Sequence, residues 1–285
     1  MKKDVYQMVT DRIIEQLEKD IIPWHKPWSG TKNGAYNRFS NRSYSLLNQM
    51  ILKHSGEYGT YKQWSEIGGH VRKGETAEMI VFWKFLQKEV ENENGEVEIK
   101  QIPYLKYYNV FHISQIEGVE PKEREELYEV EPIEEAEKIK QDYIGREHLV
   151  IKEKVTDRAF YSPSQDYIEI PCKEQYQYIE EYYSTLFHEA VHSTGHKSRL
   201  DRLQTGYNAH FGSETYSKEE LTAEMGSAMI RNIIGIETEK SFKNSSAYIK
   251  NWLQVLKNDN KFIVSASGKA EKAVKYILGE NDLQE

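Results

Sequence analysis

Three residues within the segment Leu186–His196 have the types and the spacing of a metal site. His188, Glu189 and His192 follow the pattern His-Glu-x-x-His. On a helix, residues four apart lie one turn apart on the same face, so the two imidazoles can converge on one metal ion while the glutamate flanks a bound water. The alternative is a surface helix that carries these residues by chance. The pattern favours metal-dependent hydrolysis with Glu189 as the general base.

The stretch before this motif predicts that its helix is buried on one side. Apolar residues recur there at helical spacing. They are Ile179, Tyr182, Tyr183, Leu186 and Phe187. A helix anchored in this way can hold its histidines in place, which strengthens the interpretation as a metal site.

Two histidines leave a hydrolytic zinc site incomplete, because such sites have three protein ligands and keep a fourth position for water. His196 is one alternative for the third ligand, since Gly195 could end the helix and turn the chain back. However, His196 lies four residues beyond His192, and an unbroken helix would carry it away from the shared metal.

The segment Tyr216–Ile230 offers a stronger third ligand. Ser217 can cap a helix there, and Glu220 follows three residues later in a capping-box pattern. Glu220 and Glu224 resemble the pattern of glutamate zincins, in which one glutamate binds the metal and an acidic residue one turn later orients a ligand histidine. We expect Glu220 to be the ligand and Glu224 its support. The reverse assignment and a solvated acidic face remain alternatives.

Zn²⁺ is the expected cofactor of such a zinc-dependent metallopeptidase, with Mn²⁺ or Co²⁺ as alternatives. Tyr207 and His210 lie between the two motif segments. They could stabilise an oxyanion or bind substrate, although only their proximity in the sequence suggests this. A purely structural role is the alternative for both residues.

The length and composition predict a soluble protein with two domains. The chain has 285 residues, one cysteine (Cys172) and a net charge of -8. A single cysteine excludes an intrachain disulfide. The N-terminal segment lacks the uninterrupted apolar stretch of a signal peptide, and eighteen apolar residues nowhere run together. We therefore expect a cytoplasmic protein with no membrane partner.

Charge is unevenly distributed along the chain. Residues 1–88 hold 14 Lys or Arg and 9 Asp or Glu, a net charge of +5, whereas residues 117–147 hold 5 and 12, a net charge of -7. The acidic stretch also contains two prolines and reads as a solvated connector. We predict an α+β protein with one domain at 1–117, an acidic linker at 118–132, and a second domain at 133–285.

The front domain combines many aromatic residues with basic ones. After a helix predicted over Asp4–Ile22, aromatic and basic residues alternate up to Trp83. A cationic groove with aromatic platforms suits single-stranded nucleic acid, because every base can stack and Lys or Arg neutralises the backbone. The alternative is that most of these aromatic rings form the core of a small domain.

Further elements follow from alternation and turn residues. Two strands are predicted over Glu78–Lys88 and Glu96–Tyr108, the second continuing to Ile113. The back domain should begin with a helix over Ile133–Gly145 and a hairpin around the turn 162–165. Its last helices are expected over Phe242–Leu256 and Lys269–Leu278. An edge strand of that hairpin, beside the metal helix, could hold an extended peptide by main-chain pairing.

These segments together resemble a known family, the ArdC-type antirestriction proteins. The front motifs PWHKPW at 23–28, YGTYKQW at 58–64 and GGHVRKGE at 68–75 are similar to its N-terminal single-stranded-DNA-binding domain. The back motifs AFYSPSQDYIEIP at 159–171, FHEAVHSTGHKSRLDR at 187–202 and EELTAEMGSAM at 219–229 are similar to its zincin-like domain. One departure is residues 42–46, RSYSL, where a Tyr-Arg-Gly-like turn would be usual.

The resemblance implies a protein of plasmids or other mobile elements that binds incoming single-stranded DNA and protects it from restriction. It points to DNA contacts among the following residues: Trp24, Trp28, Asn48, Tyr61, Trp64, Arg72 and Lys73. Two other functions remain open. One is a DNA-tethered repair or regulatory protease with an unknown protein substrate. The other is a noncatalytic zincin scaffold in which DNA coating alone gives protection.

Overall fold

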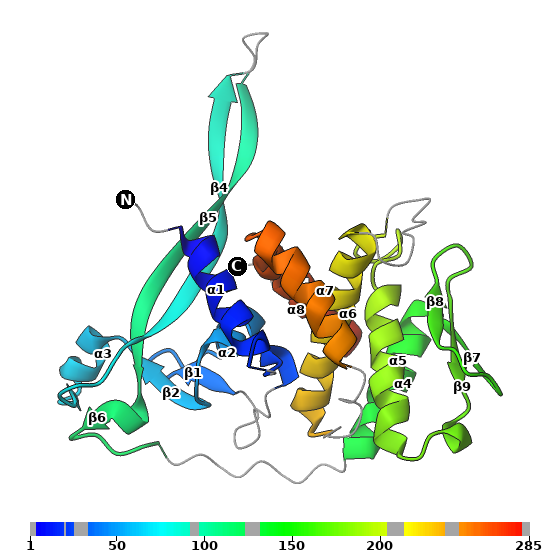
Figure 1. The fold of residues 1–285 in the computed structure, drawn as a ribbon, viewed down its shortest axis with the longest axis horizontal. Coiled ribbons are helices and arrows are strands. Elements are labelled where there is room, and N and C mark those ends of the chain that lie inside the picture. The colour runs from blue at the N-terminus through cyan, green and yellow to red at the C-terminus, as the bar shows by residue number, and fades with distance from the viewer. Residues whose placement is uncertain are drawn as a thin grey trace.

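The chain folds into an α+β structure with two parts, as predicted (Figure 1). The computed structural model describes residues 4–19, 21–25, 34–91, 97–122, 132–203, 214–236 and 245–280. In the front half the elements are α1 (Val5–Leu17), η1 (Pro23–His25), β1 (Ala35–Asn37), α2 (Leu46–Ile51), β2 (Gly56–Gly59), α3 (Tyr61–Glu66), β3 (His70–Val71), β4 (Glu78–Glu91), β5 (Val97–His112), η2 (Ile113–Gln115) and β6 (Ile116–Glu117). In the back half they are α4 (Pro132–Glu147), β7 (Val150–Lys154), β8 (Phe160–Ser162), β9 (Tyr167–Pro171), η3 (Lys173–Gln175), α5 (Ile179–Ser193), α6 (Glu214–Ile234), α7 (Ser245–Asn258) and α8 (Phe262–Leu278).

The front half contains a four-stranded sheet in the order β1-β2-β5-β4. The predicted hairpin of β4 and β5 is confirmed, and its antiparallel pairing runs from Glu78 opposite Val110 to Glu91 opposite Val97. Figure 1 shows this hairpin as a long twisted ribbon that extends beyond the rest of the molecule. A small second sheet pairs β3 with β6.

Two consecutive side chains of α2 satisfy the outer strands of the four-stranded sheet. The Asn48 amide donates to the carbonyl of Val81 in β4 at 2.9 Å and accepts from its N–H at 2.8 Å. The Gln49 amide does the same for Ala35 in β1, with both distances 2.8 Å. A side-chain amide thereby imitates a neighbouring strand at each edge, so the backbone groups of Val81 and Ala35 do not lack partners.

Helix α1 is shorter than the predicted Asp4–Ile22. Asp4 caps its first turn by accepting a hydrogen bond from the N–H of Tyr6, and the helix ends at Leu17. The N–H groups of Lys19 and Ile21 both bond to the carbonyl of Gln16, which closes the last turn before Pro23 is reached. The apolar face of the helix is buried as the periodicity predicts.

The back half places a three-stranded sheet beside a set of helices. The predicted hairpin is confirmed as β8 and β9, with Tyr161 opposite Ile168. Strand β7, which lies outside the predicted elements, pairs with β9 in parallel, so the order is β7-β9-β8 and β8 is an edge strand. Helix α5 packs against both β8 and β9.

The last two helices join the two halves of the chain. Helix α8 begins at Phe262 rather than at the predicted Lys269, and it contacts α6, α2 and α5. One core cluster therefore contains side chains of α1, α2 and β4 together with those of α6, α7 and α8. At its centre Trp24 meets Trp252 edge to face, with 5.1 Å between ring centroids. The division at 118–132 stays a prediction, but the halves share apolar packing.

A second core cluster belongs to the back half and supports α5. It includes every apolar residue that the periodicity before the His-Glu-x-x-His motif predicts to be inward, apart from Ile179, which is partly buried against it. Within the described ranges, no helix combines the length and apolarity that crossing a bilayer requires.

Candidate metal centre

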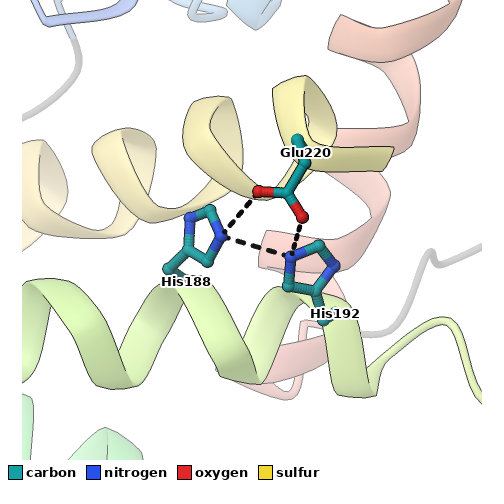
Figure 2. A group of neighbouring side chains, drawn as sticks. All are labelled: His188, His192 and Glu220. Atoms are coloured by element: carbon teal, nitrogen blue, oxygen red, sulfur yellow. Dashed lines mark hydrogen bonds and ion pairs between the residues drawn. The ribbon is translucent and has the colours of Figure 1, made fainter. Parts of the chain in front are cut away.

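His188, His192 and Glu220 converge at the contact between α5 and α6 (Figure 2). The two imidazole Nε2 atoms lie 3.2 Å apart. The Glu220 carboxylate lies across from both, with one oxygen 3.5 Å from Nε2 of His188 and the other 3.4 Å from Nε2 of His192. Among the described residues, these three form the one cluster of potential metal ligands in which each side chain offers a donor atom to a common point.

The separations fit one tetrahedral metal ion. Bonds of about 2.0–2.2 Å from zinc to nitrogen and oxygen, arranged tetrahedrally, place the donor atoms about 3.3–3.6 Å from each other. The imidazole nitrogens are 3.2 Å apart and lie 3.5 and 3.4 Å from different oxygens of Glu220, and one donor atom from each residue lies within 4.8 Å of the others. Two imidazoles and one carboxylate are also a known donor set of hydrolytic zinc sites with an open fourth position.

Small residues bring the two helices close enough for this convergence. A Cβ atom at Gly226 of α6 would lie 2.7 Å from a methyl carbon of Val191 in α5. The Ser227 hydroxyl of α6 donates to the carbonyl of Ser184 in α5 at 2.9 Å. This close packing places Glu220 over the histidines.

Glu219 holds the far side of His192. One of its carboxylate oxygens lies 3.4 Å from Nδ1 of His192 and 2.8 Å from the guanidinium of Arg202. Arg202 also donates to the Thr194 hydroxyl and to the Val191 carbonyl, both at the end of α5. A carboxylate on Nδ1 fixes the ring orientation and leaves Nε2 as the ligand atom. Sequence reasoning missed this residue, although the adjacent pair Glu219-Glu220 was visible.

The prediction that Ser217 caps this helix is wrong, because α6 begins three residues earlier, at Glu214. Glu220 consequently lies inside the helix and is free of a capping role. Glu224 is half-buried one turn further on, and its charge contributes to raising the pKa of His188. The supporting role of Glu224 stays a prediction, and Glu219 lies 3.4 Å from Nδ1 of His192.

The charges around the site favour a cation. Burial by itself lowers the pKa of the His192 imidazole, but the carboxylates of Glu219 and Glu220 outweigh it and raise that pKa to about 10. The pKa of His188 is raised in the same way, chiefly by Glu220. Burial raises the pKa of Glu220, yet the two imidazoles lower it well below its usual range. The site therefore attracts protons, and a divalent ion would take their place.

Glu189 is buried beside the ligands, with 7% of its surface exposed. Its negative charge contributes to the raised pKa values of both His188 and His192. Burial, and to a smaller extent the charge of Glu189, raises the pKa of the Tyr176 phenol. This position suits a base that removes a proton from water.

His196 is not part of the converging group. Helix α5 ends at Ser193, and the imidazole of His196 bonds to the hydroxyl of Ser198 at 2.7 Å. Gly195 does turn the chain, as predicted, but the turn leads to Leu203, whose N–H bonds to the Gly195 carbonyl at 2.8 Å. The alternative of His196 as the third ligand is thus contradicted. Tyr207 and His210 lie outside the described residues.

In the front half the predicted DNA-contacting tryptophans lie in the interior. Trp24 and Trp64 have no exposed surface. The Trp64 indole N–H donates to the carbonyl of Phe111 at 3.0 Å, and Trp24 packs on Trp252. In this conformation neither ring has a face for a base, because each already fills a packed core. Trp28 lies outside the described residues.

The remaining predicted contacts differ in exposure. Asn48 is 5% exposed and is occupied by the β4 edge, so it has a structural role. Tyr61 is 62% exposed at the start of α3. Arg72 is exposed and donates to the carbonyl of Ser114, and Lys73 is exposed in the following turn. Tyr61, Arg72 and Lys73 therefore stay open as DNA contacts.

Comparison with known proteins assigns both halves to families. Residues 3–111 match the N-terminal domain of anti-restriction factor ArdC, and residues 137–269 match a zincin-like metallopeptidase family. The antirestriction ArdC protein of plasmid R388, in its Mn(II)-bound crystal structure, is 34% identical with a TM-score of 0.76, covering 99% of this chain and 100% of that one. The metal-free structure is 33% identical with a TM-score of 0.74 and covers 98% of each chain.

Two kinds of curated relatives are also similar. A DNA primase TraC of Escherichia coli is 34% identical over 98% of this chain, which spans only 27% of that relative. An uncharacterized protein, y4eC, of Sinorhizobium fredii is 31% identical, covering 96% of this chain and 91% of its own length. The likeness thus extends over the whole chain in proteins of very different length.

Proposed function

Because this chain belongs to the family of ArdC-type antirestriction proteins, we propose that it binds single-stranded DNA and protects DNA that enters a cell on a mobile element. We further propose that its zincin-like half is a metal-dependent peptidase. The observation that carries the second proposal is the convergence of His188, His192 and Glu220 at tetrahedral spacing.

His188, His192 and Glu220 would hold the ion, with Glu219 keeping His192 in the ligating orientation. Zinc is the proposed ion, because two imidazoles and a carboxylate are a zinc hydrolase donor set, and the Mn(II)-bound relative supports a divalent metal. Mn²⁺ and Co²⁺ are the alternatives. When bound, such an ion lowers the pKa of a water molecule and polarises a carbonyl.

Glu189 would act as general base and then as general acid. Its carboxylate takes a proton from the attacking water and later passes it to the nitrogen of the leaving amine. Burial of Glu189 beside the ligands limits its contact with bulk water and so supports a defined path for that proton. The exchange of Glu189 for glutamine would remove this proton acceptor and leave the three ligands in place.

Strand β8 would hold the substrate. It is an edge strand of the β7-β9-β8 sheet and it packs against the metal helix α5. An extended peptide could pair with its free backbone groups and so lie along the site. This geometry favours an unfolded or locally opened protein segment as the substrate class.

Single-stranded DNA binding is tested by fluorescence anisotropy with an oligothymidine of about fifteen nucleotides, a length within the usual site sizes. Affinity should fall as salt rises, because phosphate contacts release counterions. Affinity that stays constant between low and high salt, or no binding at all, would count against this part of the proposal.

Peptidase activity is tested with Glu189→Gln beside the wild type, using an unfolded protein substrate with and without the oligonucleotide. The variant should keep its metal and its DNA affinity and lose hydrolysis. Hydrolysis that DNA stimulates would favour the alternative of a DNA-tethered repair or regulatory protease. Protection of an incoming plasmid that survives Glu189→Gln would favour the noncatalytic scaffold.

A further inference from the structure

Part of the β4–β5 hairpin combines aromatic and basic residues without any acidic one. We call residues 79–88 and 99–111 the aromatic ribbon. It contains no Asp or Glu, and four lysines: Lys84, Lys88, Lys100 and Lys106. It also contains seven aromatic residues: Phe82, Trp83, Phe85, Tyr104, Tyr107, Tyr108 and Phe111. In a chain with a net charge of -8, this segment is locally cationic and highly aromatic.

The strand register gathers three of these residues on one face. Phe82 lies opposite Lys106, and Ile80 lies opposite Tyr108. Because side chains of a strand alternate between its two faces, Phe82, Lys106 and Tyr108 share a face. Phe82 is 50% exposed and Tyr108 is 41% exposed, and the ammonium group of Lys106 lies 4.9 Å from the centroid of the Tyr108 ring.

The opposite face of the ribbon anchors it to the body of the protein. Met79 and Val81 point into the core cluster shared with α1 and α2, with 4% and 5% exposed. Further along that face, Trp83 and Tyr107 emerge from the core and are 41% and 37% exposed. The exposed rings therefore lie next to residues of the same strands that are packed in the core, and Figure 1 shows the hairpin extending away from the body of the protein.

The exposed aromatic rings and the lysines of the ribbon indicate what kind of ligand it binds. Large exposed rings in a contiguous patch mark a binding surface in a soluble protein. The charged residues of the ribbon itself are all lysines, which attract a polyanion and disfavour pairing with a second copy of the same ribbon. Aromatic rings beside lysines on an open sheet face suit unpaired bases, which offer flat faces, whereas the bases of a duplex are hidden in the stack.

We propose that a single DNA strand lies along the aromatic ribbon, with bases stacked on Phe82 and Tyr108 and with Lys106 at a backbone phosphate. Diagonal neighbours on a strand pair lie about 7–8 Å apart, so the two rings can receive separate bases. The inference rests on the proposed single-stranded DNA binding and names its surface. It replaces Trp24 and Trp64, whose rings are buried, by rings that the structure exposes.

The test compares the full-length protein with the double variant Phe82→Ala/Tyr108→Ala in binding to the oligothymidine. Loss of each stacked ring should weaken binding about tenfold or more, so the double variant should lose about a hundredfold. The matched control, Phe82→Tyr/Tyr108→Phe, keeps both rings and should bind within about twofold of the wild type. Thermal unfolding of all three proteins shows whether the substitutions disturb the fold.

A second measurement uses salt. Lys106→Gln should reduce the slope of log affinity against log salt by about 0.7, the value for one phosphate contact on a single strand. The comparison variant is Tyr61→Ala, which removes the exposed ring on α3. Wild-type affinity in the folded double alanine variant would overturn the proposal, whether or not Tyr61→Ala weakens binding.

The outcomes separate the two proposals. If the wild type binds the oligothymidine and the ribbon variants bind equally well, only the ribbon inference fails. If the wild type itself does not bind, the proposed function fails and the ribbon inference fails with it. Self-association that the double alanine variant abolishes, without a change in DNA affinity, would make the ribbon an interface between copies and would also overturn the proposal.

Discussion

Functional residues could be predicted from the sequence at the metal centre but much less well in the front half. In the metal centre, His188, His192 and Glu220 come together as the sequence analysis predicts. In the front half, Trp24 and Trp64 are buried, although both were predicted to contact DNA. Exposed rings are found instead on the predicted Tyr61 and on Phe82 and Tyr108, which were not predicted. The spacing of residues along a helix determines which side chains share a face. The number of aromatic residues in a segment does not determine which of them are exposed.

The contrast also extends to how each surface is built. The metal centre lies between two packed helices, and its ligand His192 is supported by the buried pair Glu219 and Arg202. The aromatic ribbon is a strand pair on which Phe82 and Tyr108 are about half exposed on one face. Single substitutions should therefore have large effects at the first site and graded effects at the second.

The largest expected effect concerns the third ligand. Glu220→Ala should lower metal affinity by more than about a hundredfold, because it removes a direct ligand, whereas loss of a supporting residue typically costs less than that. Glu224→Ala should retain about one metal ion per chain. Elemental analysis of the purified proteins checks this. Metal loss in Glu224→Ala alone would make Glu224 the third ligand. The ligand predicted from spacing would then be wrong at the metal centre as well.

Next in size is the effect of Trp64→Ala on stability. The change leaves a cavity in the front core and should lower the free energy of unfolding by about 3–5 kcal/mol. Denaturant titration measures it. The milder Trp64→Phe should cost less, and its folded protein should bind single-stranded DNA as the wild type does. A loss of DNA affinity in stable Trp64→Phe would show that the ring reaches DNA.

A smaller effect is expected for Glu219→Gln. The substitution keeps the size of the side chain and removes the charge that faces His192 and Arg202. Metal affinity should fall about 10- to 100-fold, as is typical when a residue that orients a ligand is changed. Competition with a chromogenic chelator measures the affinity, with Glu224→Gln as the comparison. Equal affinities in the wild type and Glu219→Gln would remove Glu219 from the site.

The smallest expected effect is that of Asn48→Ala. Without its amide, both the N–H and the carbonyl of Val81 lose a partner at the edge of β4, which should cost about 1–3 kcal/mol of stability. DNA affinity of the folded variant should not change. A variant with wild-type stability and weakened DNA binding would return Asn48 to the list of DNA contacts and narrow the contrast between the two regions.

Much of the fold is readable from the sequence because it depends on local patterns. The β4–β5 hairpin, the β8–β9 hairpin and the metal helix follow from alternation, turn residues and helical periodicity. The start of α6 was misplaced because Ser217 is a good cap by composition, yet the helix continues upstream to Glu214. Local signals fix where an element lies more reliably than where it ends.

What the sequence could not provide is long-range packing. Whether Trp24 faces solvent or Trp252 depends on a contact between residues far apart in the chain, for which no local pattern exists. Glu219 became visible as the partner of His192 only once α6 was docked on α5. The outward face of Phe82 was not readable either, because residues 79–83 are all apolar and show no alternation of apolar with polar residues.

Helix α1 and the helices α7 and α8 that cover it lie far apart in the sequence, so the ribosome makes them at different times. The hydroxyl of Thr10 donates to the carbonyl of Asn260, 250 residues later, and the apolar face of α1 packs against α7 and α8. At about 5–20 residues per second, a ribosome needs roughly 12–50 s to bridge that interval. Throughout that time the nascent α1 lacks its contacts with α7 and α8, so this part of the core can close only after both helices have been made.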